Sequence, residues 1–407
     1  QLVYRGFNYM LPAALDDIKI LDISQGISGS YCSKLLADFG AEVIKVEPLG
    51  GEQLRTMGPF FDDDPNPEKS LIHIVLNNNK KGITLNLETT SGARMFKKLV
   101  AQVDVVVENY HPGYLKSLGL SFEDLEKVNP KIVMTSITGF GQSGPYSDYK
   151  SEDIVAYAMG GVMAFSGTKD REPLKHGGFQ SQYEAGLNAA LSTGFALFGR
   201  DFDGKSQHVD VSVQEVVNAS LVMNQPLFPF SGAVQGRRNP KGTMYTQIMP
   251  CADGYFVSQT GARATWDDQV RFYDKPELAE ERFANPVQRL DHGEEFDSIL
   301  LDATKDRTMK EMFKTASEEY QMLFGISQTP EDLSSCPQLE SRNFYQEIDH
   351  PVIGKTKIPF RLFNITESPF QHRNSAPLLG QHNEEIYTEN LGYSKEDVIR
   401  LRELNII

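Results

Sequence analysis

The sequence has few cysteines and no long apolar run. Its 407 residues include three cysteines, Cys32, Cys251 and Cys336, which lie far apart and form neither a CxxC pair nor a Cys/His metal spacing. This pattern argues against a disulfide framework and against a zinc site, and it fits a reducing cytoplasm. No apolar run reaches the length of about 18 residues that spans a bilayer, and residues 1–10 carry no signal-peptide core. We therefore expect a soluble cytoplasmic protein with no metal and no membrane partner.

An excess of positive charge is also missing. The chain has 40 lysines and arginines against 55 aspartates and glutamates, which gives a formal net charge of −15. Such a charge repels polyanions at long range, and no basic run offers a local patch for them, so we expect no nucleic-acid partner. The content of 40% hydrophobic and 23% charged residues is typical of a globular protein with a packed core.

The common catalytic motifs are absent too. The sequence contains no Walker loop, no HExxH, no GxSxG and no GxGxxG that directly follows a first strand. Residues 139–144 (GFGQSG) have the glycine spacing of a dinucleotide loop, but they follow the fifth strand-like run and lead into Pro145. As a nucleotide fingerprint this segment carries little weight.

What the first half of the chain does show is an alternation of buried strands and amphipathic helices. Apolar runs with strand character alternate with segments of helical period and capping signals. The predicted strands are residues 18–23, 41–47, 82–87, 103–107 and 131–137, and the predicted helices are residues 31–39, 90–102 and 121–127. This alternation predicts an open, mainly parallel α/β sheet whose ligand lies beyond the carboxyl ends of the strands.

The second half changes in character. Helices are expected over residues 153–166 and 183–198, followed by a strand over 207–213. We expect a large Rossmann-like domain that begins with residues 1–225, a smaller α+β domain over 226–330, and a return segment over 331–407 that completes the large domain.

A series of short segments resembles the class III CoA-transferases, the family of formyl-CoA transferase and carnitine CoA-transferase. The segments are 36–48 (LADFGAEVIKVEP), 79–80 (NK), 107–113 (VENYHPG), 136–145 (SITGFGQSGP), 204–210 (GKSQHVD), 253–255 (DGY) and 379–386 (LGQHNEEI). They follow one another in the order of the family and cover nearly the whole chain. The resemblance implies CoA, as a substrate thioester, a Rossmann-like large domain formed by both ends of the chain, and two subunits that interlock as a dimer.

The resemblance also implies a reactive carboxylate. In the family this group lies shortly after the glycine-rich loop, at the start of a helix, and the matching residue is Asp153 within residues 151–160 (SEDIVAYAMG). A carboxylate can attack a thioester to give a mixed anhydride, which the CoA thiolate then converts into an enzyme thioester. The structural alternative is that Asp153 is an acid in the first turn of a helix, stabilised by the helix dipole. The two roles are compatible.

Residues that would bind CoA carry over from the same family motifs. They are Asn109 and Tyr110, and Lys80 beside Asn79, whose cation and amide groups suit phosphate and pantetheine. A solvated loop lysine and a strand-end turn are the structural alternatives.

The chain departs from formyl-CoA transferase at two phosphate contacts. It has no arginine within residues 113–118, and Thr138 stands where that family has a lysine. Lys116 is the expected substitute and Arg55 a further candidate, although either could be an ordinary surface charge.

Other functions remain open at this stage. The α-methylacyl-CoA racemases share the fold but have a histidine directly before the matching aspartate and a second aspartate about thirty residues later. This chain has Glu152 and the residues 181–182 at those places, so the pair of groups that exchanges an α-proton is missing. A non-catalytic CoA-binding subunit of a heteromer is the other alternative. The reading that we carry forward is transfer of CoA from a donor such as succinyl-CoA to a carboxylic acid, by a homodimer or by a heterodimer with a homologous chain. A benzylsuccinate-type acceptor is one option.

Overall fold

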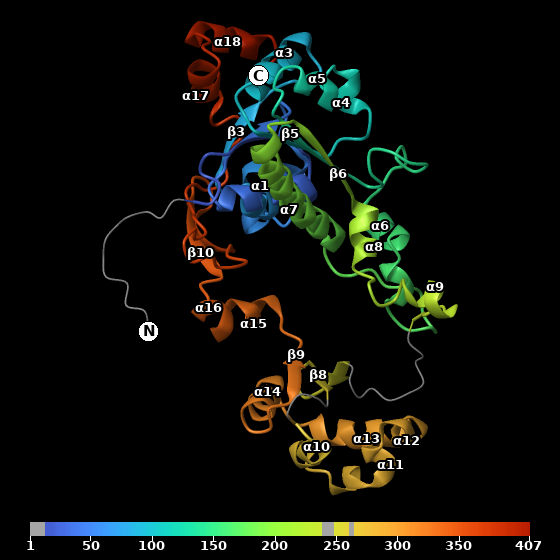
Figure 1. Cartoon of the computed structure of the whole chain (residues 1–407). Helices are drawn as coiled ribbons and strands as arrows, with labels where there is room; N and C mark the ends of the chain where they lie inside the picture. The colour runs from blue at the N-terminus through green and yellow to red at the C-terminus, as the bar shows by residue number, and fades with distance from the viewer. Residues whose placement is uncertain (1–12, 238–247, 260–263) are drawn as a thin grey trace. The chain divides into compact units, whose positions relative to one another are not determined.

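A computed structural model of the chain describes residues 13–237, 248–259 and 264–407 (Figure 1). The contacts within the chain divide it into two units. One unit comprises Gln1–Ser166, Pro173–Gly236 and Asn343–Ile407, and the other comprises Gly167–Glu172 and Arg237–Arg342. The large unit is therefore built from both ends of the sequence.

The large unit contains a six-stranded sheet in the order β3-β2-β1-β4-β5-β6, and all neighbouring strands are parallel. Its strands are β1 (Lys19–Asp22), β2 (Glu42–Glu47), β3 (Lys80–Thr84), β4 (Val105–Glu108), β5 (Val133–Thr138) and β6 (Gln207–Ser212). This is the order of the doubly wound dinucleotide-binding fold, in which the strand order reverses between β1 and β4. The predicted α/β class and parallel sheet are confirmed, and the reversal marks where a ligand crevice forms.

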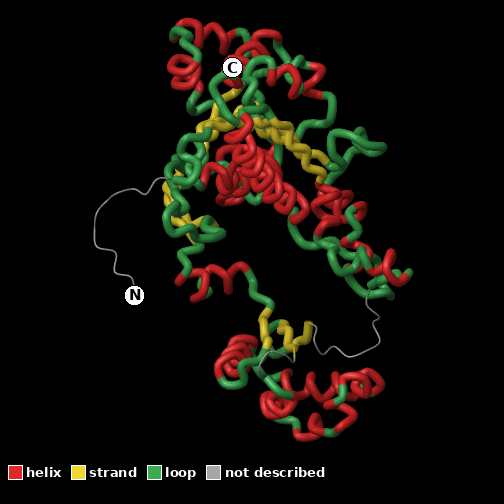
Figure 2. The backbone as a smooth tube through the Cα atoms, viewed as in Figure 1, coloured by secondary structure: helices red, strands yellow, loops and turns green. Residues whose placement is uncertain are grey.

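Helices cover both faces of this sheet (Figure 2). Those that follow the early strands are α1 (Ile27–Asp38), α2 (Leu71–Leu76), α3 (Thr90–Val100), α4 (Tyr114–Ser117) and α5 (Phe122–Glu126). Those that follow β5 and β6 are α6 (Asp153–Met159), α7 (Gln180–Asp203), α8 (Val213–Ala219) and α9 (Leu227–Ser231), with a 3-10 turn η4 (Val162–Phe165) after α6. Short 3-10 turns η1 (Gln53–Thr56), η2 (Phe61–Asp63) and η3 (Pro67–Lys69) join β2 to α2.

The alternation of side chains along the buried strands explains the two cores. Leu21 and Val106 face a core completed by α3, α5 and the C-terminal segment, whereas Ile20 and Val105 face a core completed by α1 and α7. Helices α1 and α7 approach closely because α7 carries Gly186, where an added Cβ would lie 2.5 Å from the carbonyl oxygen of Ser28.

The C-terminal segment returns to the large unit. It contains the antiparallel pair β10 (Tyr345–His350) and β11 (Gly354–Pro359), the helices α17 (Asn383–Glu385) and α18 (Lys395–Glu403), and a π-helical turn η6 (Ile386–Asn390) between these helices. Asn383 Oδ1 accepts the N–H of Thr84 at 2.9 Å, and the hydroxyl of Tyr387 donates to the carbonyl oxygen of Thr84 at 2.6 Å. The return segment therefore packs beside β3, the strand at one edge of the sheet.

The second unit is a small body of helices and antiparallel strands. Its sheet has three antiparallel strands, β7 (Ile248–Pro250), β8 (Tyr255–Gln259) and β9 (Leu323–Ile326). Its helices are α10 (Trp266–Tyr273), α11 (Glu281–Ala284), α12 (Pro286–Asp291), α13 (Gly293–Thr304), α14 (Met309–Glu318), α15 (Pro330–Ser334) and α16 (Pro337–Ser341), with a 3-10 turn η5 (Pro276–Ala279). Phe256, Phe272, Phe283 and Phe296 form the centre of its core. Within the described residues, no helix has the length and apolar character required to cross a membrane.

Several helix ends differ from the sequence-based expectation. Helix α1 begins at Ile27, four residues before the predicted start, because Gly26 takes a left-handed φ of 71° at its N-cap. Helix α6 ends at Met159 instead of continuing to residue 166, because Gly160 and the left-handed Gly161 end it and η4 follows. The capping box predicted at the start of the helix over 121–127 is confirmed, with Ser121 and Asp124 as its two members.

Candidate active site

A pocket of about 340 Å³ lies at the edge of the sheet where the strand order reverses, between β1 and β4. Its wall comes from the segments that follow three neighbouring strands: Gln25 and Ser28 after β1, Asn109 and Tyr110 after β4, and residues 137–139 at the end of β5. The loop before α6 and the residue Asp153 close another side. All of these segments belong to the large unit. The pocket lies where an open parallel sheet binds its ligands.

Asp153 is the first residue of α6 and is held from two sides. Its Oδ1 accepts the backbone N–H of Ser181 at 3.1 Å and the hydroxyl of Ser181 at 2.6 Å. Its Oδ2 lies 2.5 Å from the Nζ of Lys175. Asp153 is only 5% exposed, yet it lines the pocket. Asp153 is thus a buried carboxylate that faces a pocket and has charged or polar donors on both oxygens, which hold it in one orientation.

The loop that carries Asp153 approaches β5 through a glycine. A Cβ on Gly139 would lie 2.2 Å from the Cβ of Ser151, so only glycine lets the end of β5 come this close to the loop. Gly139, in the glycine-rich segment noted in the sequence, thus lets the loop that leads to Asp153 pack against the end of β5.

The predicted CoA-binding residues Asn109 and Tyr110 both line the pocket. Asn109 Oδ1 accepts the backbone N–H of Gln25 at 2.7 Å, and its Nδ2 donates to the carbonyl oxygen of Gln25 at 2.5 Å. The side-chain amide of Asn109 therefore ties the loop after β1 to the loop after β4. Burial raises the pKa of the Tyr110 hydroxyl to about 12, and this hydroxyl accepts a bond from Gln25 Nε2 at 3.4 Å.

Lys80 does not lie at this pocket. It belongs to a buried cluster of polar side chains around Asp22. Its Nζ is within 2.8–3.1 Å of four oxygens, those of Asp22 Oδ2, the carbonyl of Ser30, Ser33 Oγ and Asn77 Oδ1. Lys80 is 1% exposed and is not among the residues that line the pocket. Burial, which outweighs the opposing charge of Asp22, lowers the pKa of Lys80 to about 8. A phosphate contact for Lys80 stays a prediction.

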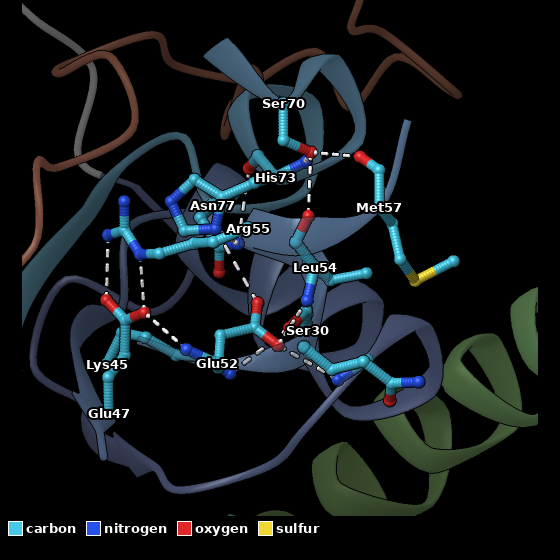
Figure 3. Close-up of polar contacts among 12 residues, drawn as sticks. Ser30, Lys45, Glu47, Glu52, Leu54, Arg55, Met57, Ser70, His73 and Asn77 are labelled. Carbon is cyan, nitrogen blue, oxygen red and sulfur yellow. Dashed lines mark hydrogen bonds and ion pairs between the residues drawn. The ribbon is translucent and has the colours of Figure 1, made fainter. Parts of the chain in front are cut away.

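Arg55, the further phosphate candidate, is buried and paired with Glu47 and Glu68, and Figure 3 shows its contact with Glu47. Its Nε and Nη2 donate to the two oxygens of Glu47 at 2.6 and 2.8 Å, and its Nη1 lies 2.7 Å from Glu68. Figure 3 also shows Glu52, whose Oε2 accepts the N–H of Gly26 at 3.0 Å. This network fixes the turn after β2 and, through Gly26, the pocket loop.

Lys116 lines a second pocket, of about 440 Å³, which shares Tyr110, His111, Pro112 and Ser147 with the first. The same pocket contains Glu108, at the end of β4. Burial raises the pKa of Glu108 to about 7, even though the N–H of Tyr110 donates to it at 2.7 Å. The structure thus brings Asp153, Asn109 and Tyr110 to one pocket and Lys116 to the next one.

Sequence reasoning did not find Lys175 and Ser181. They follow Asp153 by 22 and 28 residues and reach it because α7 begins beside α6. Residues 173–181 (PLKHGGFQS) carry no motif of their own, and only their position before a long helix, whose first N–H groups lack helical partners, was available as a signal. Within the described residues, no group of three or more histidine, cysteine, aspartate or glutamate side chains lies close enough to hold a metal ion.

Comparisons with known proteins identify the family of the chain. The profile of CoA-transferase family III matches residues 15–383. A succinyl-CoA–D-citramalate CoA-transferase of Chloroflexus aurantiacus is 34% identical over 401 residues, which cover 97% of this chain and 98% of that protein. The BbsE subunit of succinyl-CoA:(R)-benzylsuccinate CoA-transferase from Thauera aromatica is 29% identical over 405 residues, 96% of this chain and 97% of that one.

A solved structure shares the fold over nearly the same range. The crystal structure of a CAIB/BAIF family protein from Brucella suis matches with a TM-score of 0.84 and 28% identity, covering 93% of this chain and 100% of that chain. The family resemblance inferred from the ordered motifs is confirmed. The chain belongs to CoA-transferase family III and is an enzyme of the CoA-transferase class.

Proposed function

We propose that the protein moves CoA from an acyl-CoA donor, such as succinyl-CoA, to a carboxylic acid through a thioester on Asp153. The observation that carries this proposal is a carboxylate that is 5% exposed and still lines the pocket where the strand order reverses. Such burial excludes bulk water, which would hydrolyse an acyl-enzyme, while the pocket admits the substrate.

The reaction proceeds in two halves. The Asp153 carboxylate attacks the donor thioester carbonyl and releases CoA thiolate, which leaves a mixed anhydride. The thiolate then attacks the aspartyl carbon and releases the donor acid, giving the aspartyl-CoA thioester. The acceptor carboxylate attacks this thioester, and the released thiolate attacks the acceptor side of the new anhydride, which restores Asp153 and forms the product thioester.

The pocket wall supplies groups for the CoA thioester. Tyr110 contributes an aromatic face, and Thr138 Oγ1 is buried with no hydrogen-bond partner among the described residues, so it is free to bind a ligand. Lys116 lines the adjoining pocket and would meet a phosphate there. These positions support binding of the pantetheine arm beside Tyr110 and of phosphate beside Lys116.

The donor and acceptor follow from relatives. The two relatives described above are named for succinyl-CoA and for D-citramalate or benzylsuccinate. We propose succinyl-CoA as donor and a dicarboxylic acid as acceptor.

We propose the reducing cytoplasm as the compartment in which the protein works. The three cysteines are free in the described structure, and burial raises the pKa of the Cys32 thiol to about 12, which fits that proposal.

We also propose that the enzyme works as a dimer, with a second copy or a homologous chain. Helix α7 carries an apolar stripe at helical spacing, and its five members are between 48% and 77% exposed: Leu187, Leu191, Phe195, Phe198 and Phe202. A stripe of this size on a soluble enzyme is typical of a surface that another subunit covers. Sedimentation of the wild type and of a Phe195→Glu/Phe198→Glu double variant tests this, with a monomeric wild type as the contradicting result.

Intact mass tests the covalent step. The protein is mixed with succinyl-CoA, with and without hydroxylamine, and the wild type is compared with Asp153→Ala and with the surface control Asp201→Asn. We expect a CoA-sized adduct that hydroxylamine removes, present in the wild type and in the control and absent from Asp153→Ala. No adduct in the wild type across several donors contradicts the transferase mechanism. Exchange of an α-proton with deuterated solvent, without an acceptor acid, would instead support the racemase alternative.

A further inference from the structure

The two oxygens of Asp153 have different surroundings. Oδ1 is bonded to two donors of a single residue, the N–H and the hydroxyl of Ser181, which is fully buried. Ser181 is the second residue of the 24-residue helix α7, so its N–H is one of those without a partner inside the helix. These donors have fixed positions, and the positive end of the helix dipole adds to them.

Oδ2 is held by a single group that is able to move. Lys175 has a side chain that is 27% exposed, and its Nζ also donates to the carbonyl oxygens of His176, at 3.0 Å, and Gly178. The ammonium group can therefore leave Oδ2 and keep two other partners. A lysine on a flexible stem with alternative acceptors is a releasable contact, unlike a backbone N–H at a helix start.

We propose that these surroundings assign separate roles to the two oxygens: Oδ2 attacks the thioester, whereas Oδ1 never leaves the enzyme and is stabilised as an oxyanion by the N–H and the hydroxyl of Ser181. The proposal rests on the aspartyl-CoA mechanism given above. It makes Ser181 the oxyanion donor for both tetrahedral intermediates at the aspartyl carbon, and Lys175 the group that releases Oδ2 when the acyl-CoA enters.

The assignment fixes the path of each oxygen atom. In the first half-reaction, Oδ2 forms the anhydride bridge and departs with the donor acid when the thiolate attacks the aspartyl carbon. In the second half, one carboxylate oxygen of the acceptor forms the new bridge, and it stays on Asp153 when the thiolate attacks the acceptor carbon. Each turnover therefore replaces one aspartyl oxygen with an acceptor oxygen, and always at the same position.

Labelled oxygen tests this directly. The enzyme is given succinyl-CoA and a saturating acceptor acid with oxygen-18 in both carboxylate positions, for many turnovers but before the product acids accumulate. The peptide that contains Asp153 is then weighed. We expect one oxygen-18 atom, however many turnovers have passed. Two oxygen-18 atoms show that the carboxylate rotates between turnovers and overturn the assignment. A peptide with no label, from enzyme that makes product, overturns the aspartyl mechanism itself.

A matched pair of serine variants tests the oxyanion role. Ser181→Ala removes the hydroxyl donor and keeps the N–H, whereas Ser192→Ala in the same helix removes a hydroxyl that donates to the carbonyl oxygen of Asn188. We expect Ser181→Ala to lower kcat by about 10- to 100-fold with little change in KM, and to admit a second oxygen-18 atom. Ser192→Ala retains wild-type kcat and one label. A Ser181→Ala enzyme with wild-type kcat and a single label contradicts the role of Ser181, and thermal unfolding of both variants separates a folding defect from a catalytic one.

Discussion

The large unit contains two clusters made from the same three side-chain types, and they differ in their access to the pocket. In the buried cluster, which we call the Asp22 cluster, Asp22 contacts Lys45 at 3.2 Å and Lys80 at 3.1 Å. Asp22 also accepts hydrogen bonds from the hydroxyls of Ser24 and Ser33. In the cluster at the pocket, Asp153 is bound by one lysine and one serine. Each cluster joins a carboxylate, lysine and serine, but all the charged side chains of the first are 0% exposed.

The difference shows what burial does to identical chemistry. Burial alone would raise the pKa of Asp22, but its two lysines and two serine hydroxyls hold that pKa well below the usual range. In the Asp22 cluster, the carboxylate and both ammonium groups each have several partners inside the protein. The Asp153 cluster has one mobile cation and one face on a pocket, which leaves an oxygen available for reaction.

The largest effect is expected from an isosteric change at the pocket. Asp153→Asn removes the nucleophilic oxygen and should lower kcat by at least about 10³-fold, because the covalent route closes. Its unfolding midpoint should stay near that of the wild type, since Lys175 keeps two carbonyl partners. Steady-state assays and urea unfolding measure the two quantities. Substantial activity in Asp153→Asn contradicts the contrast between the clusters.

At the Asp22 cluster we expect the opposite result, which is a loss of stability. Asp22→Asn leaves Lys45 and Lys80 buried with their shared counter-charge removed, which should lower the free energy of unfolding by about 3–5 kcal/mol. Urea unfolding measures this, with the exposed Asp201→Asn as control. An Asp22→Asn protein as stable as the wild type shows that the cluster is not a structural one.

Glu108 extends the comparison to an acid that is buried with hydroxyl and amide donors in place of lysines. Burial raises the pKa of Glu108 from 4.5 to about 7. Between these two pH values, the carboxyl group is protonated in the folded state and ionised in the unfolded state. The free energy of unfolding should therefore fall, by about 1–3 kcal/mol, as the pH rises from about 4.5 to about 7.

In Glu108→Gln this pH dependence should flatten, because the amide oxygen still accepts the N–H of Tyr110 and carries no charge. Urea midpoints at several pH values, with the exposed Glu403→Gln as control, measure the difference. Equal pH dependence in the wild type and in Glu108→Gln is the result that contradicts it.

The smallest effect is expected at an exposed cation. Lys116→Gln should raise KM for the acyl-CoA by about 2- to 5-fold, the size of one solvated ion pair, and should weaken the dependence of KM on salt. The control is Lys131→Gln, because Lys131 is exposed and lines neither pocket. An unchanged KM in Lys116→Gln removes this lysine from the phosphate contacts.

Most of the fold was accessible from the sequence because it depends on local patterns. Apolar strands alternating with amphipathic helices predict a parallel sheet, and the capping pair at Ser121 and Asp124 locates a helix to the residue. The register at strand ends was less accessible. The predicted strand over 82–87 is β3 at Lys80–Thr84, because the buried ammonium group of Lys80 counts as polar in any pattern yet sits inside the sheet.

The site divides along the same line. Asp153 and Asn109 were predicted because they lie in motifs that are continuous in the sequence, and both line the same pocket. The burial of Lys80 and Arg55 was not, since a lysine or arginine looks solvated until its counter-charges Asp22 and Glu47 are placed beside it by the fold. Contacts between segments far apart in the chain have no local signature.

The pair of hydrogen bonds between the Asn109 amide and the backbone of Gln25 has a thermodynamic consequence for ligand affinity. It orders the loop after β1 when the protein folds, so the entropy lost by this loop is part of the free energy of the cooperative folding transition. Fixing one backbone residue costs about 1–2 kcal/mol, and a loop that is ordered beforehand does not subtract that amount from each binding event. The loop after β1 is therefore already ordered when the thioester binds, and the entropy of ordering this loop does not weaken ligand affinity.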